Sequence, residues 1–181
     1  VDLIQAQARI SALQMSVRAR KPEAAQCPRN ARLLVLDFDG VVTDGNVYVD
    51  ADGRESVRCS RRDGHGLALV RDSGVHVAVI TAYPTAAAAA RCKRLQIPYH
   101  IKSNKITMLM ELARSIAAGV VYVGDDVHDV ECITWAQYGV VPPDAHELAV
   151  NAAGYMTVHG GGRGAVRDVC DWILTSKESR V

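Results

Sequence analysis

Residues 33–45 read LLVLDFDGVVTDG. Four consecutive apolar residues with branched side chains are typical of a buried parallel strand. Asp37 and Asp39 follow where this strand runs out, and open α/β sheets bind their ligands at that carboxyl edge. Carboxylates beside a buried strand are costly unless they are paired or hold a metal. The stretch therefore predicts a functional site.

Taken alone, an Asp-x-Asp triplet also occurs in surface turns and in the metal-binding motif of glycosyltransferases. The rest of the chain supplies matching parts in order. Apolar runs at 77–80 and 120–123 each end in polar residues, and a lysine opens a helical pattern between them. These polar residues are Thr81, Lys105, Asp125, Asp126 and Asp129. Because parallel strands end at the same edge of a sheet, we expect these groups to converge with the first pair of aspartates.

This set of residues suits phosphoryl transfer through an aspartyl-phosphate, since a carboxylate can act as a covalent nucleophile. A phosphate dianion repels a carboxylate, so a hard cation must bridge them, and Mg²⁺ prefers oxygen ligands. Asp37 and Asp125 are the natural metal ligands, with the backbone carbonyl of Asp39 in reach. Lys105 and the Thr81 hydroxyl would hold the phosphoryl oxygens. Asp39, two residues along the strand from Asp37 and so on the same side, would protonate the leaving group and then activate water.

The four motifs, in this order, resemble the haloacid dehalogenase superfamily of phosphatases. The resemblance implies that Asp37 is the nucleophile and Asp39 the general acid and base. It implies phosphate binding by Thr81 and Lys105, and a magnesium ion held by Asp37, Asp125 and the carbonyl of Asp39. Two further carboxylates would orient metal-bound waters or the lysine: Asp126 and Asp129.

Within this superfamily the chain is similar to phosphatases of 3-deoxy-D-manno-octulosonate 8-phosphate (KDO 8-phosphate) and of sialic-acid 9-phosphates. The similarity covers residues 33–174, and the segment GGRGAVR at 161–167 points most directly to this group. The resemblance implies a homotetramer in which this segment reaches an adjacent active site. Arg163 and Arg167 could then bind the substrate carboxylate or phosphate. Without the resemblance, the segment is typical of a flexible turn.

One motif departs from the family. Where the family commonly reads Thr-Gly-Arg, this chain reads Thr81-Ala82-Tyr83. The hydroxyl is kept and the arginine is lost, which leaves the identity of the sugar acid open. We expect hydrolysis of KDO 8-phosphate; the alternatives are a sialic-acid 9-phosphate substrate, phosphoryl transfer to another sugar, and a non-catalytic tetramerisation domain like that of sialate cytidylyltransferases.

The alternation of apolar strands and helical patterns predicts a doubly wound, Rossmann-like parallel sheet over residues 33–181. A hairpin is expected at 46–60, around an aspartate-rich turn that lacks the spaced ligands of a calcium loop. Helices are expected at 63–72, 84–95, 104–117, 127–137 and 166–174. No cap domain fits between the motifs. Residues 1–32 form a separate unit with the apolar spacing of an amphipathic helix, lying on its own domain or acting as an oligomer zipper, followed by a linker.

Composition agrees with one globular domain without a membrane span. Of the 181 residues, 49% are hydrophobic, and the net charge is +1, which gives no argument for binding nucleic acid or a membrane. The five cysteines are odd in number and show no close spacing, as expected of a reduced, cytoplasmic protein. The histidines lack zinc spacing; His65 and His128 are expected to be exposed or hydrogen-bonded. Trp135 and Trp172 are expected in the core or at a subunit contact.

Overall fold

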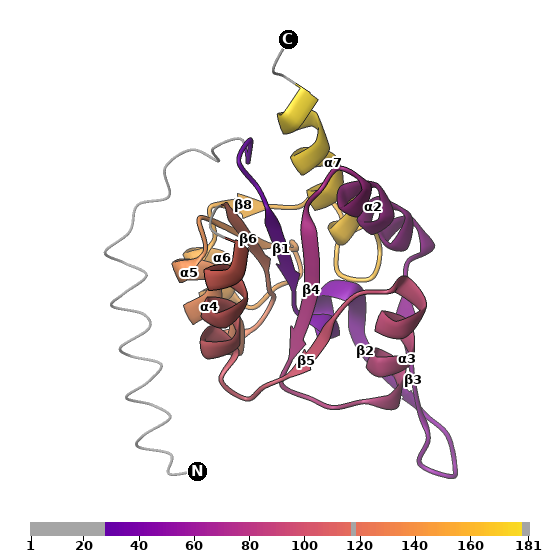
Figure 1. Cartoon of the computed structure of the whole chain (residues 1–181). Helices are drawn as coiled ribbons and strands as arrows, with labels where there is room; N and C mark the ends of the chain where they lie inside the picture. The colour runs from indigo at the N-terminus through magenta and orange to yellow at the C-terminus, as the bar shows by residue number, and fades with distance from the viewer. Residues whose placement is uncertain (1–27, 117–118, 179–181) are drawn as a thin grey trace, which may run out of the picture.

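A six-stranded parallel sheet forms the centre of the chain (Figure 1). The computed structural model describes residues 28–116 and 119–178. The strands lie in the order β5 (Tyr99–Ile101), β4 (His76–Thr81), β1 (Leu33–Leu36), β6 (Val120–Val123), β7 (Tyr138–Val141) and β8 (Tyr155–Met156). At the carboxyl end of the central strand, Leu36 pairs with Val79 of β4 and Val123 of β6. The expected parallel sheet is confirmed.

Helices cover both faces of this sheet. On one side lie α2 (Arg61–Asp72), α3 (Ala86–Leu95) and α7 (Ala165–Glu178); on the other lie α4 (Lys105–Ile116), α5 (Val130–Trp135) and α6 (Glu147–Ala152) (Figure 1). Each face of the sheet has its own hydrophobic core: the first core lies under α2, α3 and α7, and the second under α4, α5 and α6. Leu34 and Leu36 point into the first core, and Leu33 and Val35 point into the second. Because successive side chains of a strand face opposite ways, β1 must be apolar throughout. The doubly wound α/β fold is confirmed.

The hairpin comes directly after the first motif. Residues Phe38–Val42 make one irregular helical turn, followed by β2 (Thr43–Val49) and β3 (Glu55–Cys59), which pair with each other only. At its tip, the Asp50 carboxylate accepts hydrogen bonds at 2.9 Å from the backbone N–H groups of Asp52 and Arg54. This is the geometry of an ordinary solvated turn. In the described part of the chain, only the hairpin and α2 lie between the first motif and β4.

Some predicted boundaries were wrong for local reasons. The helix expected from Pro84 starts at Ala86, because the Thr85 hydroxyl accepts a hydrogen bond from the Ala88 N–H and so acts as the N-cap. The helix expected at 127–137 is a 3₁₀ turn at Val127–Asp129 followed by the six-residue α5. Strands β5, β7 and β8 and the six-residue α6 were not predicted, because their patterns are too short to show a period.

Part of the predicted organisation lies outside the described residues. This holds for positions 1–27, and so for the whole apolar stripe of the expected amphipathic helix and for Cys27; the division into 1–32 and 33–181 stays a prediction. Cys59, Cys92, Cys132 and Cys170 are free thiols. No helix within 28–116 and 119–178 has the length and apolar character needed to span a membrane.

The two tryptophans differ in their surroundings. Trp172 stacks on Tyr155 with ring centroids 4.4 Å apart and packs against the first core. Trp135, at the end of α5, is 42% exposed. The core placement expected for both is therefore correct for Trp172 only, and a subunit contact through Trp135 stays a prediction.

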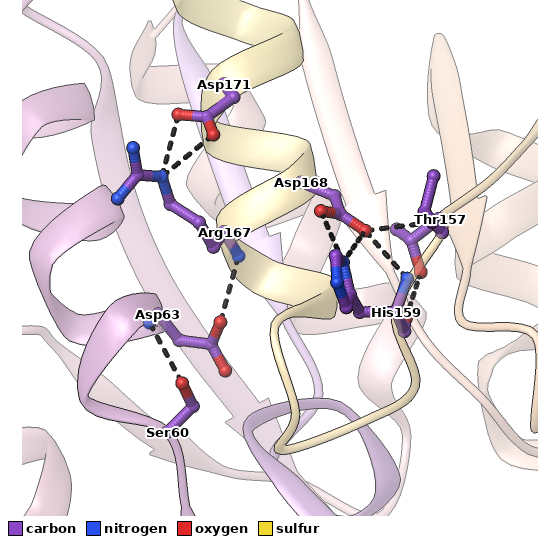
Figure 2. A network of polar contacts seen from close by, with 8 residues as sticks. Ser60, Asp63, Thr157, His159, Arg167, Asp168 and Asp171 are labelled. Atoms are coloured by element: carbon purple, nitrogen blue, oxygen red, sulfur yellow. Dashed lines mark hydrogen bonds and ion pairs between the residues drawn. The ribbon is translucent and has the colours of Figure 1, made fainter.

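Asp63 joins α2 to α7 in the network of Figure 2. Its Oδ1 accepts a hydrogen bond of 3.0 Å from the Arg167 N–H in the first turn of α7, while the buried Oδ2 has no hydrogen-bond partner in the described structure. Burial raises the pKa of Asp63 to about 6, although the Arg167 N–H and the Arg91 charge act to lower it. Since the folded state binds the proton more tightly than the unfolded chain, this carboxyl favours folding at low pH and less so as pH rises.

We therefore expect Asp63→Asn to become progressively more stable than the wild type as pH rises from about 4 to about 6. The difference in unfolding free energy should grow by up to about 3 kcal/mol, because that is about the free energy that corresponds to a pKa raised from 3.8 to about 6. Urea unfolding of both proteins in EDTA across this range measures it. Asp72→Asn, at the exposed end of the same helix, is the control. A pH-independent difference would show that Asp63 does not titrate as argued.

Candidate active site

The predicted site residues converge on one cavity at the carboxyl edge of the sheet. The cavity has a volume of about 200 Å³. Its walls come from the ends of β1, β4 and β6, from the first residue of α4 and from the start of the hairpin. The lining residues are Asp37, Asp39, Gly40, Gly45, Thr81, Ala82, Tyr83, Lys105, Asp125, Asp126, His128 and Asp129. All seven residues assigned to the chemistry or to its support therefore meet at one place.

Asp37, Lys105 and Asp129 form the buried centre of the cavity. The Lys105 Nζ lies 2.8 Å from the Asp37 Oδ1 and 2.8 Å from the Asp129 Oδ1. Burial alone would lower the pKa of Lys105, but the two facing carboxylates outweigh it and raise that pKa. Burial and the Asp129 charge raise the pKa of Asp37, against the effect of Lys105. Lys105 is therefore a fixed positive charge that leaves the Asp37 Oδ2 available.

Asp129 is held from several directions. Besides Lys105, its Oδ1 accepts a hydrogen bond of 2.6 Å from the Tyr122 hydroxyl. Its Oδ2 accepts bonds of 3.2 Å from the backbone N–H groups of Asp125 and Asp126. These contacts orient the lysine and the turn after β6. Tyr122 was not predicted as a site residue; its only signal in the sequence is a hydroxyl within an otherwise aliphatic buried strand.

Asp125 has the features of a metal ligand. Its Oδ1 is buried and has no hydrogen-bond partner among the described residues. Burial, followed by the charges of Asp129 and Asp126, raises the pKa of Asp125 to about 7. One carboxylate oxygen each from Asp37, Asp125 and Asp129 lies within 4.8 Å of the others. A divalent cation bound there would compensate an otherwise unfavourable cluster of buried charge, so the residues fit a hard metal ion.

Asp39 lines the cavity, but the reason given for its position was wrong. Strand β1 ends at Leu36, and Asp39 lies in the irregular turn that follows, not two residues along a strand. The turn is set by Gly40, whose φ of +78° favours glycine. Burial is the main cause that raises the pKa of Asp39, which is half-buried. A carboxyl that retains its proton more readily is suited to general acid catalysis.

Thr81, at the end of β4, forms the turn that follows this strand. Its Oγ1 accepts a hydrogen bond of 3.1 Å from the Tyr83 N–H, which closes a tight turn at the cavity wall. Tyr83, in place of the family's arginine, is 62% exposed and lines the cavity. His65, on α2, and His128 are both exposed, as expected, and His128 also lines the cavity.

Three residues that were predicted to support the metal site or to bind substrate make other contacts in the structure. Asp126 is among the cavity residues, but its Oδ1 accepts a hydrogen bond of 2.7 Å from the Val127 N–H. Arg163 lies 3.9 Å from Asp44, and the Arg167 Nε donates a bond of 2.8 Å to Asp171. Neither arginine lines the cavity of its own chain. Their contact with the site of a neighbouring subunit stays a prediction.

Known proteins share both the sequence and the fold. No protein-family model matches the chain. It is 37% identical over 161 residues to the KDO 8-phosphate phosphatase KdsC of Salmonella typhimurium, covering 86% of each protein. It is 39% identical over 153 residues to KdsC of Escherichia coli K12, covering 82% of this chain and 81% of that protein.

Solved structures agree. A KDO 8-phosphate phosphatase from Moraxella catarrhalis, in complex with magnesium, phosphate and KDO, aligns with a TM-score of 0.81 at 30% identity over 86% of this chain and 92% of that one. A cobalt-bound phosphatase from Haemophilus influenzae aligns with a TM-score of 0.80 at 28% identity over 84% of this chain and 92% of that one. With the cavity's carboxylates and lysine in place, the chain belongs to the KDO 8-phosphate phosphatase family of the haloacid dehalogenase superfamily and is a phosphatase.

Proposed function

We propose that the chain hydrolyses KDO 8-phosphate in the presence of Mg²⁺, through an aspartyl-phosphate on Asp37. The observation that carries the proposal is the arrangement of Asp37, with Oδ1 held 2.8 Å from the Lys105 ammonium, beside an unpaired carboxylate oxygen of Asp125. The magnesium ion would be held by Asp37, Asp125 and the backbone carbonyl of Asp39. When bound, it would neutralise charge between the nucleophile and the phosphoryl group.

The chain's own residues account for the remaining chemistry. The Asp37 Oδ2 attacks phosphorus, the bond from phosphorus to the sugar oxygen breaks, and Asp39 gives that oxygen its proton. Lys105 and the Thr81 hydroxyl hold phosphoryl oxygens as charge spreads over them. Asp39 then takes a proton from water, which attacks the aspartyl-phosphate and restores the Asp37 carboxylate with release of phosphate.

The deciding experiment is phosphate release from KDO 8-phosphate by the full chain with Mg²⁺. We expect a kcat/KM above about 10⁴ M⁻¹s⁻¹, which is in the usual range for enzymes. Parallel assays with Co²⁺ and with EDTA test the metal requirement. Negligible release with KDO 8-phosphate, in a protein that hydrolyses another phosphate ester, would reject the substrate and keep the phosphatase chemistry.

The second candidate substrate is a sialic-acid 9-phosphate, and the observation that favours it is Tyr83. Tyr83 lines the cavity, with its side chain exposed, at the position where the family commonly carries an arginine, so the part of the cavity that would contact the sugar acid differs. Paired kinetics on the two phosphates decide between them. A kcat/KM that favours the nine-carbon substrate would make this alternative the function.

Asp39→Asn is expected to lower kcat about 10²–10⁴-fold with a sugar phosphate, because the amide cannot protonate the leaving oxygen. The rate of the first step, transfer of the phosphoryl group to Asp37, should fall much less with p-nitrophenyl phosphate, because its leaving group is stable as an anion. Single-turnover measurement of p-nitrophenol and sugar release separates the two cases. Equal losses with both substrates would argue that Asp39 positions the metal or the loop rather than moving a proton.

We also propose a cytoplasmic homotetramer whose subunits complete one another's sites. The support is the run of exposed apolar residues at the end of β2, where Val47, Tyr48 and Val49 are 49%, 57% and 64% exposed, so that both faces of the hairpin carry apolar groups. Large exposed apolar groups on a projecting hairpin suit a subunit contact. Arg163 and Arg167 would act at the neighbouring site. The four described free thiols suit a reducing compartment.

Tyr48→Asp is expected to shift the protein from tetramer to smaller species, because a carboxylate in an apolar interface loses its hydration without a partner. Sedimentation velocity measures the change, with Arg54→Asp at the hairpin tip as a charge-changing control. A wild-type monomer would reject the tetramer, and an unchanged tetramer in Tyr48→Asp would place the interface elsewhere.

A further inference from the structure

The segment Gly160–Gly164, here called the glycine-rich strap, lies against the loop that carries Asp39. The Gly162 N–H donates a hydrogen bond of 3.0 Å to the Val41 carbonyl. A Cβ on Gly161 would overlap the Gly40 carbonyl and lie 2.8 Å from the Thr43 carbonyl. These contacts are between backbones, so no flexible side chain can move aside. Only glycine allows this approach at position 161.

Gly40 is confined on the cavity side as well. A Cβ there would overlap the Asp125 carboxylate. The Gly40 N–H donates a bond of 3.2 Å to the Thr43 Oγ1. The same peptide unit contains the carbonyl of Asp39, so any displacement of Gly40 moves that carbonyl too. Gly40 therefore links the glycine-rich strap to two of the proposed metal ligands.

Two carboxylates fix the chain here: Asp168 holds the two residues before the glycine-rich strap, and Asp144 holds the strap itself. Asp168, in the first turn of α7, accepts hydrogen bonds from the N–H groups of Val158 at 2.9 Å and His159 at 2.8 Å, and its Oδ1 lies 2.9 Å from the His159 Nδ1 (Figure 2). Asp144 accepts a bond of 3.2 Å from the Gly161 N–H. These contacts do not fit the flexible turn that composition alone suggests. They give the strap one position relative to the sheet.

We propose that Gly161 is a positioning residue for the metal site. By carrying no side chain, it lets Gly40 take the position from which the Asp39 carbonyl and the Asp125 carboxylate can bind Mg²⁺ together. The inference rests on the proposed magnesium site, but it concerns metal affinity, which is measured without substrate.

The test is calorimetric titration of the full chain with MgCl₂, in the wild type, in Gly161→Ala and in Gly154→Ala. Gly154 is the matched control, because a Cβ there would meet nothing nearer than the Gly139 carbonyl oxygen at 3.9 Å. Gly161→Ala should raise the Kd for Mg²⁺ about 10–100-fold, as losses of supporting contacts around metals do. Gly154→Ala should change it less than about twofold. Urea unfolding in EDTA shows that each variant is folded.

An unchanged Kd in a folded Gly161→Ala protein would overturn the inference. If this variant does not fold, Asp168→Asn weakens the anchor of the two residues that lead into the strap, with Asp171→Asn on the same helix as its control. Weaker Mg²⁺ binding in Asp168→Asn, with unchanged binding in Asp171→Asn, supports the inference. The same Mg²⁺ affinity in the two variants overturns it. A wild type that binds Mg²⁺ and loses it on Gly161→Ala, yet does not hydrolyse KDO 8-phosphate, would reject the proposed substrate and leave this inference standing.

Discussion

Asp37→Asn is expected to reduce kcat for KDO 8-phosphate by about 10⁴-fold or more, a loss typical of removing a covalent nucleophile. The amide cannot attack phosphorus and offers no anionic oxygen to a metal. The asparagine side chain has the same size and keeps an oxygen that can face the Lys105 ammonium, which lies 2.8 Å from the Asp37 Oδ1 in the wild type. The fold should therefore survive, and steady-state phosphate release measures the loss.

The same variant tests the covalent intermediate. Acid-quenched wild type, mixed with substrate for milliseconds, should carry one phosphoryl group on the peptide that contains Asp37, and Asp37→Asn should carry none. Asp52→Asn, at the exposed hairpin turn, controls for the loss of one carboxylate. Wild-type turnover in Asp37→Asn, or a phosphoryl group on another residue, would reject the assigned nucleophile.

The central part of the fold could be predicted because its signals are local. The apolar run before Asp37 has no alternation, and that pattern is typical of a strand covered on both faces. Three such runs end in Asp37, Thr81 and Asp125, so the parallel topology alone brings these groups to one edge. The structure confirms the sheet, and its cavity contains all three residues.

Other features depend on contacts that no periodicity encodes. The site of Asp39 is set by a glycine turn and not by a strand, because Gly40 takes a positive φ beside the Asp125 carboxylate. Tyr122 reaches Asp129 from within a buried strand, where a tyrosine is most simply explained as core. Gly161 was interpreted only through its family motif, since its contact with Gly40 joins residues more than a hundred positions apart.

Lys105→Ala is expected to destabilise the protein by about 3–5 kcal/mol, because removing one partner of a buried ion pair leaves charge unpaired. The lysine side chain is 3% exposed, and those of Asp37 and Asp129 are 9% and 0% exposed. Without the ammonium, two carboxylates would face each other across a buried space. Urea unfolding in EDTA measures the loss, and Lys102→Ala, an exposed lysine nearby, should show almost none.

The structural and catalytic roles of Lys105 can be separated by also changing Asp129. In Asp129→Asn, the amide oxygen can face the two backbone N–H groups while its NH₂ group donates to the Tyr122 hydroxyl, which then acts as acceptor. The NH₂ group then also faces the Lys105 ammonium, a donor-to-donor contact that Lys105→Ala removes. Only the Asp37 charge then remains beside position 105. Lys105→Ala should therefore cost less stability in this background than in the wild type, with a coupling of about 0.5–3 kcal/mol.

Turnover should not recover with stability in the Lys105→Ala/Asp129→Asn double variant. Stability depends on balancing the buried charges, whereas catalysis needs a positive charge directed at the phosphoryl oxygens, which no other residue replaces after the double change. Phosphate release at saturating Mg²⁺ should therefore stay as low as in Lys105→Ala alone. Recovery of both properties would mean that the lysine only supports the fold, and wild-type kinetics in Lys105→Ala would place it outside the reaction.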